Sequence, residues 1–471
     1  MKMWLSSARQ SAAGDSTCAR LRAGTVAAPR VSGKTRVTPH VRVAPCATIA
    51  ARFAIASLAA FASTNLLAAD LFIKGARVYT VGAQGTIANG DVVIHDDKIA
   101  AVGTALTAPA GATVIDAKGR VLTPGLFGGL SAIGLEEVQL EDATVDEALA
   151  IKAPFHETQL RPEFDPTMAF NPRSTIVPVT RIEGVTWTVL APSTPVFGGG
   201  NFVTGQGSAV TLDGRFDAEL PGSRSLFVNV GSATFSISGG SVAAQFMLLD
   251  QAVREVRAPG SAGEHALLTA AGREAFGRYI AGGRVVFHVD RAADIRQVLA
   301  FAKRNHMKPV IAGGTEAWVV ANDLARDKVP VVLNALANLP ADFDRIGARL
   351  DNAALLQKAG VTIAFMLDDE PTHNARKLRQ TAGVAVAHGL PFDAALAGLT
   401  ANPADIFGLG ATRGRIARGQ IADLVLWTGD PLEVSTLADQ VWIAGRPVEM
   451  HSRQTELRDR YLERVKQHQA R

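Results

Sequence analysis

Cysteine is almost missing from this chain. The 471 residues include two cysteines, Cys18 and Cys46, and both lie before residue 70. For the rest of the chain, a disulfide framework, a thiol nucleophile and a cysteine-based zinc site are therefore excluded.

An excess of positive charge is also missing once the first 69 residues are set aside. Those residues hold nine Lys and Arg and one acid, so the remainder has 39 basic and 43 acidic residues, a formal charge of −4 in place of the +4 of the whole chain. This charge offers no basis for nucleic-acid binding, and no nucleic-acid partner is expected.

Long hydrophobic runs are lacking too. The apolar run 53–62 is short and rich in alanine, too short to span a bilayer comfortably. It follows Arg52 and precedes Ala68 and Ala69, the order typical of a secretory signal with its basic region, apolar core and small-residue cleavage site. We therefore expect residues 1–69 to be a signal peptide with an N-terminal extension, and the mature chain to be exported, to the periplasm, without a membrane span. The alternatives are a start codon assigned too early, a disordered extension, or a retained membrane anchor.

Short hydrophobic runs, by contrast, recur along the chain in two patterns. Residues 70–122 and 412–450 read as short β-strands, and residues 123–411 alternate β-runs with amphipathic helices. The expected barrel strands are 122–127, 185–191, 225–230, 284–288, 309–312, 329–333 and 361–366. The sequence predicts an α/β protein: a (β/α)8 TIM barrel over 123–411, a small β-sandwich formed by 70–122 together with 412–450, and a charged helix at 451–471.

Several motifs resemble the amidohydrolase superfamily, in a branch similar to exported imidazolonepropionase-like proteins. The resemblance covers about residues 70 to 450. It is carried by Thr123-Pro124-Gly125-Leu126, Asn402-Pro403-Ala404, Asp97-Lys98-Ile99 and Ala422-Asp423-Leu424-Val425. It implies a hydrolase of non-peptide carbon–nitrogen bonds that uses one or two divalent, zinc-like ions to activate water.

The ligand positions of such a metal site are only partly kept. The resemblance implies His-x-His on the first barrel strand, one His each on the fifth and sixth, and an Asp on the eighth. The corresponding residues here are Leu130, Ala132, His288, Gly313 and Asp368. One imidazole and one carboxylate do not hold zinc tightly without further donors. A partly lost metal site is therefore predicted, with either a divalent ion or no cofactor.

His288 and Asp368 are the predicted catalytic residues and the remaining metal ligands. Asp368 would act as a base or proton shuttle, and His288 as a ligand or electrophile. Asp369, His373, Glu136, Glu137 and Glu316 are additional candidates around the barrel mouth. Each has a structural alternative: a helix cap, a solvated loop acid, or a buried histidine bonded to the backbone.

The expected partner is a small-molecule substrate or ligand, and a homo-oligomer remains open. The functional prediction is an exported amidohydrolase-like enzyme. The alternatives are a catalytically inactive barrel that acts as a periplasmic binding protein, and a structural or partner-binding barrel.

Overall fold

The computed structural model describes residues 70–150, 158–194, 200–260, 263–367 and 372–469. The predicted signal segment and both candidate aspartates, Asp368 and Asp369, lie outside the described residues.

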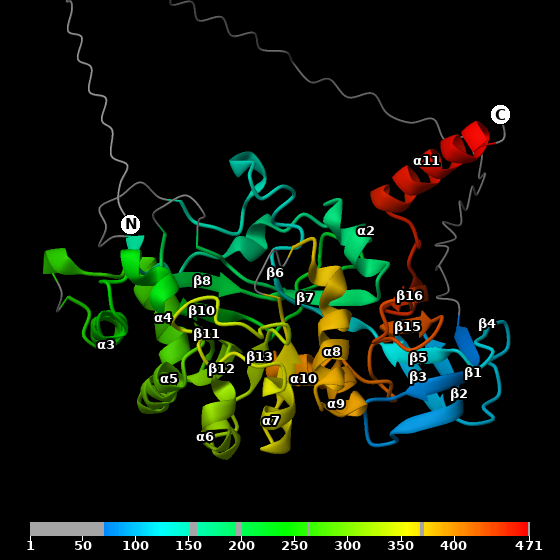
Figure 1. The fold of residues 1–471 in the computed structure, drawn as a ribbon, viewed down its shortest axis with the longest axis horizontal. Helices are drawn as coiled ribbons and strands as arrows, with labels where there is room; N and C mark the ends of the chain where they lie inside the picture. Colours follow the sequence, from blue (N-terminus) through cyan, green and yellow to red (C-terminus); the bar gives the residue numbers. More distant parts are fainter. Residues whose placement is uncertain (1–69, 151–157, 195–199, 261–262, 368–371, 470–471) are drawn as a thin grey trace, which may run out of the picture. The chain divides into compact units, whose positions relative to one another are not determined.

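Strands from the two ends of the chain form one mixed sheet of eight strands, in the order β17-β16-β15-β5-β1-β2-β3, with β4 paired to β1. The strands are β1 (Leu71–Tyr79), β2 (Thr86–His95), β3 (Lys98–Gly103), β4 (Thr113–Asp116), β5 (Val121–Pro124), β15 (Leu424–Trp427), β16 (Ala438–Ile443) and β17 (Arg446–Pro447). The two ends meet where β5 pairs with β15, with Pro124 opposite Leu424. Hydrogen bonds therefore join these strands into one sheet, where the sequence had predicted a sandwich (Figure 1).

Gly125 marks the point where the chain leaves this sheet. The Gly125 amide donates to the carbonyl of Asp423, and the next amide, of Leu126, donates to Gly184 beside β7. A Cβ at position 125 would lie 2.2 Å from Thr186 Oγ1, so only glycine fits between the two sheets. The predicted single strand 122–127 is therefore two strands, β5 and β6, which belong to different sheets.

In the described residues, the barrel part consists of two sheets, one of six strands (β14-β13-β12-β11-β10-β8) and one of three (β6-β7-β9), where the sequence had predicted one eight-stranded barrel. The strands are β6 (Leu126–Ser131), β7 (Val185–Leu190), β8 (Val203–Gly207), β9 (Ala209–Thr211), β10 (Ser225–Asn229), β11 (Arg284–Val289), β12 (Lys308–Gly313), β13 (Val331–Leu333) and β14 (Ile363–Phe365). β6 and β7 are parallel to each other, as are β10 to β14 in sequence order. The segment 203–211 runs antiparallel to both neighbours, with β9 on β7 and β8 on β10. The sequence had not predicted this strand.

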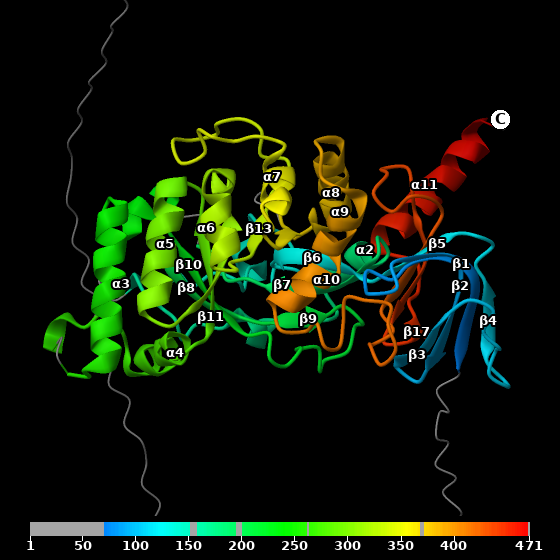
Figure 2. The same ribbon diagram turned by 90° about the horizontal axis from the view of Figure 1, so that it is seen from below.

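Helices cover the outside of these strands (Figure 2). The α-helices are α2 (Ile176–Arg181), α3 (Val242–Arg257), α4 (Ala270–Ile280), α5 (Ala292–Arg304), α6 (Ala321–Arg326), α7 (Asn352–Lys358), α8 (Leu378–Ala387), α9 (Phe392–Leu399), α10 (Ala401–Ile406) and α11 (Arg453–Gln469). Short 3-10 turns are η1 (Asp142–Thr144), η2 (Pro166–Ala169), η3 (Ser232–Ile237), η4 (Gly263–His265), η5 (Ala317–Val320) and η6 (Ala375–Lys377).

The helix α5 illustrates why these segments are helical. Its buried residues Ile295, Val298, Leu299 and Ala302 recur at the spacing of one helix face, and they pack into the core between helix and strands. The C-terminal helix α11 differs, because it buries no residue.

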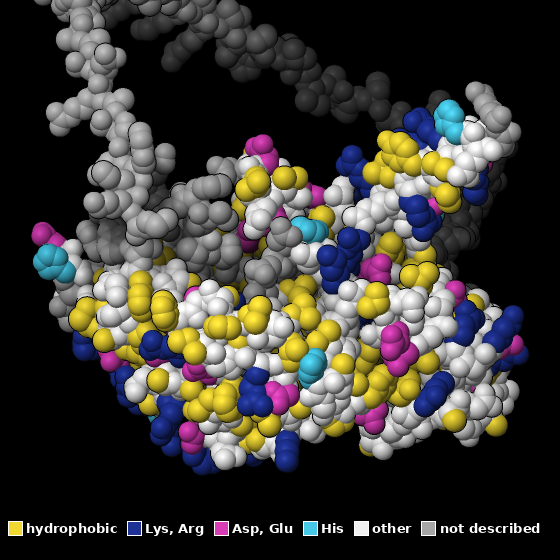
Figure 3. Space-filling model, in the orientation of Figure 1, with side chains coloured by type: hydrophobic (Ala, Val, Ile, Leu, Met, Phe, Trp, Pro, Cys, Tyr) yellow, Lys and Arg dark blue, Asp and Glu magenta, His cyan; other side chains and the backbone are white. Residues whose placement is uncertain are grey.

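Two properties of the described residues concern possible contacts with membranes and nucleic acids. None of the described helices is both long and apolar enough to cross a bilayer. On the face drawn in Figure 3, Lys and Arg side chains lie among Asp and Glu side chains rather than in one patch.

Candidate functional site

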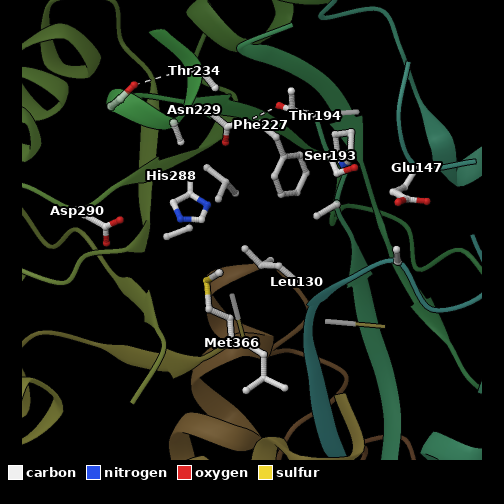
Figure 4. A pocket seen from close by; sticks show the side chains of 18 of the residues that line it. Leu130, Glu147, Ser193, Thr194, Phe227, Asn229, Thr234, His288, Asp290 and Met366 are labelled. Atoms are coloured by element: carbon white, nitrogen blue, oxygen red, sulfur yellow. Dashed lines mark hydrogen bonds between the residues drawn. The ribbon is translucent and has the colours of Figure 1, made fainter. Parts of the chain in front are cut away.

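A cavity of about 610 Å³ opens at the carboxyl ends of the barrel strands. Its wall includes Leu130 from the end of β6, Asn229 from β10, His288 from β11 and Met366 just after β14 (Figure 4). The carboxyl ends of parallel strands carry the active site in barrels of this kind, because the loops that follow the strands meet there. The cavity is therefore the candidate site.

His288 lies in the wall of this cavity, as the sequence predicts for a functional residue. The strand β11 holds it between Asn229 of β10 and Ala312 of β12, and its backbone carbonyl accepts a hydrogen bond from Val230. The side chain is half-buried and lines the cavity. It is therefore placed to contact a bound ligand.

Gly313, at the position of a family histidine, lies directly against His288. A Cβ at position 313 would lie 3.1 Å from His288 Nε2 and 2.8 Å from Asp290 Oδ1. The backbone of Gly313 has a φ of +80°, which side-chain-bearing residues rarely adopt. The local structure is thus built around glycine at this position.

Asp290, two residues after His288, is a buried residue that sequence reasoning missed. Its Oδ1 accepts hydrogen bonds from the Thr315 amide at 3.0 Å and the Thr315 hydroxyl at 2.6 Å. Its Oδ2 accepts one from Arg345 Nε at 3.1 Å. Both oxygens are therefore engaged with the protein, and Asp290 anchors the loop that carries Arg345.

Glu136, one of the predicted candidates, lies in the cavity wall beside Glu147. Glu147 is the second residue that sequence reasoning missed. Both side chains are more than nine-tenths buried, and the Glu147 carboxyl hydrogen-bonds to the Glu136 side chain. Burial, together with the nearby Glu136 and Asp146, raises the pKa of Glu147 to about 7. The loop between them contains no motif, so no sequence signal pointed to Glu147.

The structure places the remaining candidates away from the cavity. Glu316 accepts hydrogen bonds from the amides of Ala292 and Gly347, so it fixes the start of α5. Glu137 accepts a hydrogen bond from the Thr175 hydroxyl, and His373 is exposed. None of these three is among the described residues that line the cavity, and their proposed catalytic roles stay predictions.

The architecture matches a solved structure over most of its length. An amidohydrolase from Thermotoga maritima MSB8 aligns with 80% of this chain and 99% of its own, at 25% identity and a TM-score of 0.70. The family model described as "Amidohydrolase family" matches residues 250–448. This chain belongs to the amidohydrolase superfamily.

Curated relatives of this superfamily member match over shorter stretches. Amidohydrolase tasK of Hapsidospora irregularis is 41% identical over 91 residues, which is 19% of this chain and 9% of the relative. Imidazolonepropionase of Acidiphilium cryptum (strain JF-5) is 36% identical over 106 residues, 22% of this chain and 25% of that protein. The chain thus spans a quarter or less of either relative.

The described residues do not fit the divalent metal that the superfamily typically uses. Leu130 and Ala132 have no atom that ligates an ion, and Gly313 has no side chain. Within the described ranges, no three His, Cys, Asp or Glu side chains lie together in a group that could hold a metal ion. His288 alone is not a metal site, so the reaction proposed below includes no metal step.

Proposed function

We propose that this amidohydrolase-superfamily protein hydrolyses a non-peptide carbon–nitrogen bond in a small molecule bound in the barrel-mouth cavity, and that its ancestral metal site is partly lost. The observation that carries the proposal is the cavity itself. It lies at the strand ends where barrel enzymes act, and its volume, about 610 Å³, is that of a small-molecule site.

The proposed chemistry uses His288 and Asp368. Asp368 takes a proton from water as the water oxygen bonds to the carbon of the scissile group, and His288 donates a hydrogen bond to the oxygen on which negative charge develops. The carbon–nitrogen bond then breaks as the nitrogen takes the proton from Asp368. His288 lies in the cavity wall, which supports its role, whereas the role of Asp368 rests on the resemblance alone.

A second candidate function is binding without catalysis. It is favoured by the apolar side chains Leu130 and Met366, which lie beside His288 in the cavity (Figure 4). Apolar groups at these positions suit ligand packing more than water activation.

One set of measurements separates the two functions. The purified mature protein is assayed for metal content and for hydrolysis of cyclic amides, amide esters and dipeptide-like compounds, beside His288→Ala. We expect well under one equivalent of metal, chelator-insensitive hydrolysis, and a loss of about 100-fold or more in His288→Ala. Ligand binding without hydrolysis would favour the binding protein. A full equivalent of metal whose removal stops hydrolysis would contradict the proposed metal loss.

We also propose that the chain is exported to the periplasm. We further propose that it belongs to the branch of the superfamily related to imidazolonepropionases. The first rests on the order of charges and small residues before Asp70, and the second on the partial match to an imidazolonepropionase.

A further inference from the structure

The two glutamates of the cavity wall are held there by backbone hydrogen bonds on both sides. The Glu136 amide donates to Ala132, the Asp146 amide donates to Leu135, and the Glu147 carbonyl accepts from Ser193. These hydrogen bonds hold the segment that follows β6 against the segment that contains Asp146 and Glu147. Glu147 thus has a defined place, at the end of the cavity opposite His288 and Asp290 in Figure 4.

One oxygen of Glu147 receives no hydrogen bond from an N–H or hydroxyl group. Glu147 is 6% exposed, and its Oε2 is buried without such a donor among the described residues. Leaving a buried carboxylate oxygen unsatisfied costs about 1 to 3 kcal/mol, so native proteins rarely keep such an atom without a use. Because Glu147 lines the cavity, a ligand there can supply the missing donor.

The charge of the cavity wall favours a cation. Among the described residues of the wall there are five carboxyl side chains, from Glu136, Glu147, Asp290, Asp342 and Asp344, and one guanidinium group, from Arg345. Arg345 Nε lies 3.1 Å from an Asp290 oxygen and 3.6 Å from an Asp342 oxygen, so its charge is engaged on the Asp290 side.

Among the described residues, no basic side chain shifts the pKa of Glu147. The charged groups that shift the pKa of Glu147 are Glu136 and Asp146, both acidic. Below about pH 7 the buried pair therefore keeps a proton, because burial and the neighbouring acidic groups disfavour the ionised form of Glu147.

Between the two ends, Leu130, Phe227 and Met366 form an apolar part of the wall, with the polar Ser193, Thr194 and Asn229 beside it (Figure 4). A ligand that fills this space has a hydrophobic or aromatic body. A hydrated divalent ion does not match such a wall, and two carboxylates provide fewer ligands than Ca²⁺ takes.

From this geometry we propose that Glu136 and Glu147 form a subsite for a protonated amine, and that the ligand of the cavity is a small molecule with an ammonium group on a hydrophobic body. This proposal depends on the proposed function in one respect: both take the barrel-mouth cavity as the place where the ligand binds. An ammonium group carries three donors, enough to reach Oε2 of Glu147 and a second acceptor at once. When the ammonium group binds, its positive charge replaces that of the proton held by Glu136 and Glu147, and this proton is released.

The test is calorimetric titration of the mature protein with 4-phenylbutylamine and with the uncharged 4-phenylbutan-1-ol. We expect the amine to bind more tightly than the alcohol, and its affinity to rise about tenfold between pH 6 and pH 8, because the pair loses its proton near pH 7. The affinity of the alcohol should stay constant. Titrations in two buffers of different ionisation enthalpy should show release of close to one proton per amine at pH 6.

Glu147→Gln is expected to weaken amine binding at pH 8 by at least about tenfold and to remove the pH dependence, since the loss of one buried charge-assisted contact is worth 1.4 kcal/mol or more. The matched control is Glu137→Gln, a neighbouring glutamate outside the cavity, which should bind the amine as the wild type does. Glu136→Gln serves as a second variant if Glu147→Gln fails to fold.

Equal affinity for amine and alcohol, no amine binding at either pH, or an unchanged amine-to-alcohol ratio in both cavity variants would overturn the proposal. Since no turnover is measured, the result is independent of whether the protein hydrolyses a carbon–nitrogen bond.

Discussion

Glu147→Gln should change how the stability of this protein depends on pH. The folded-state pKa of Glu147 is about 7, against an ordinary value of 4.5. Below pH 4.5 the carboxyl is protonated in both the folded and the unfolded chain, so it has no effect. Between pH 4.5 and 7 the unfolded chain gives up the proton while the folded protein keeps it, and stability falls as the pH rises.

The size of this effect follows from the displacement of the pKa. A rise of the pKa from 4.5 to about 7 corresponds to about 3 kcal/mol of unfolding free energy, lost in full above pH 7. Glutamine keeps the size of the side chain and cannot ionise. The variant should therefore gain about 3 kcal/mol relative to wild type between pH 4.5 and pH 8.

Thermal unfolding followed by tryptophan fluorescence measures this difference. For a folded unit of about 400 residues, 3 kcal/mol corresponds to about 3 to 4 °C in Tm. The Tm of Glu147→Gln minus that of wild type should rise by this amount between pH 5 and pH 8, whereas Glu137→Gln should show no such rise. A difference that stays constant over this range, or falls, would refute the argument that Glu147 is buried among acidic groups.

Three further outcomes are expected. Gly313→Ala should destabilise the protein by about 2 kcal/mol more than Gly119→Ala, because both glycines have a φ near +80° but only the new Cβ at 313 meets neighbouring atoms; equal Tm losses would contradict this. Asp423→Ala should cost about 3 to 5 kcal/mol in urea unfolding, because it leaves Arg413, its buried partner, unpaired; a loss below 1 kcal/mol would show that the pair is not buried in solution. Cell fractionation and N-terminal sequencing should find the mature protein in the periplasm, beginning near Asp70, and an intact N-terminus in the cytoplasm would exclude export.

Much of the fold was predictable because it depends on local patterns. Buried parallel strands are short apolar runs, and helices such as α5 show their buried face at a spacing that can be read directly. The seven expected barrel strands were found, although the first was displaced by the sheet change at Gly125. The antiparallel segment 203–211 was not predictable, since strand direction depends on neighbours far away in the chain.

The sequence by itself determined the superfamily and made His288 a candidate, since motifs and the order of strands are local properties of the chain. It also showed that Leu130, Ala132 and Gly313 stand where metal ligands were expected. Only the tertiary structure decided what surrounds His288. It brought Glu147 from a loop without a motif to Glu136, and it left Glu137, Glu316 and His373 outside the described lining of the cavity. The reason is physical: burial and the approach of the Glu136 and Glu147 side chains, which set the pKa of Glu147, arise only when the chain folds and its segments pack together.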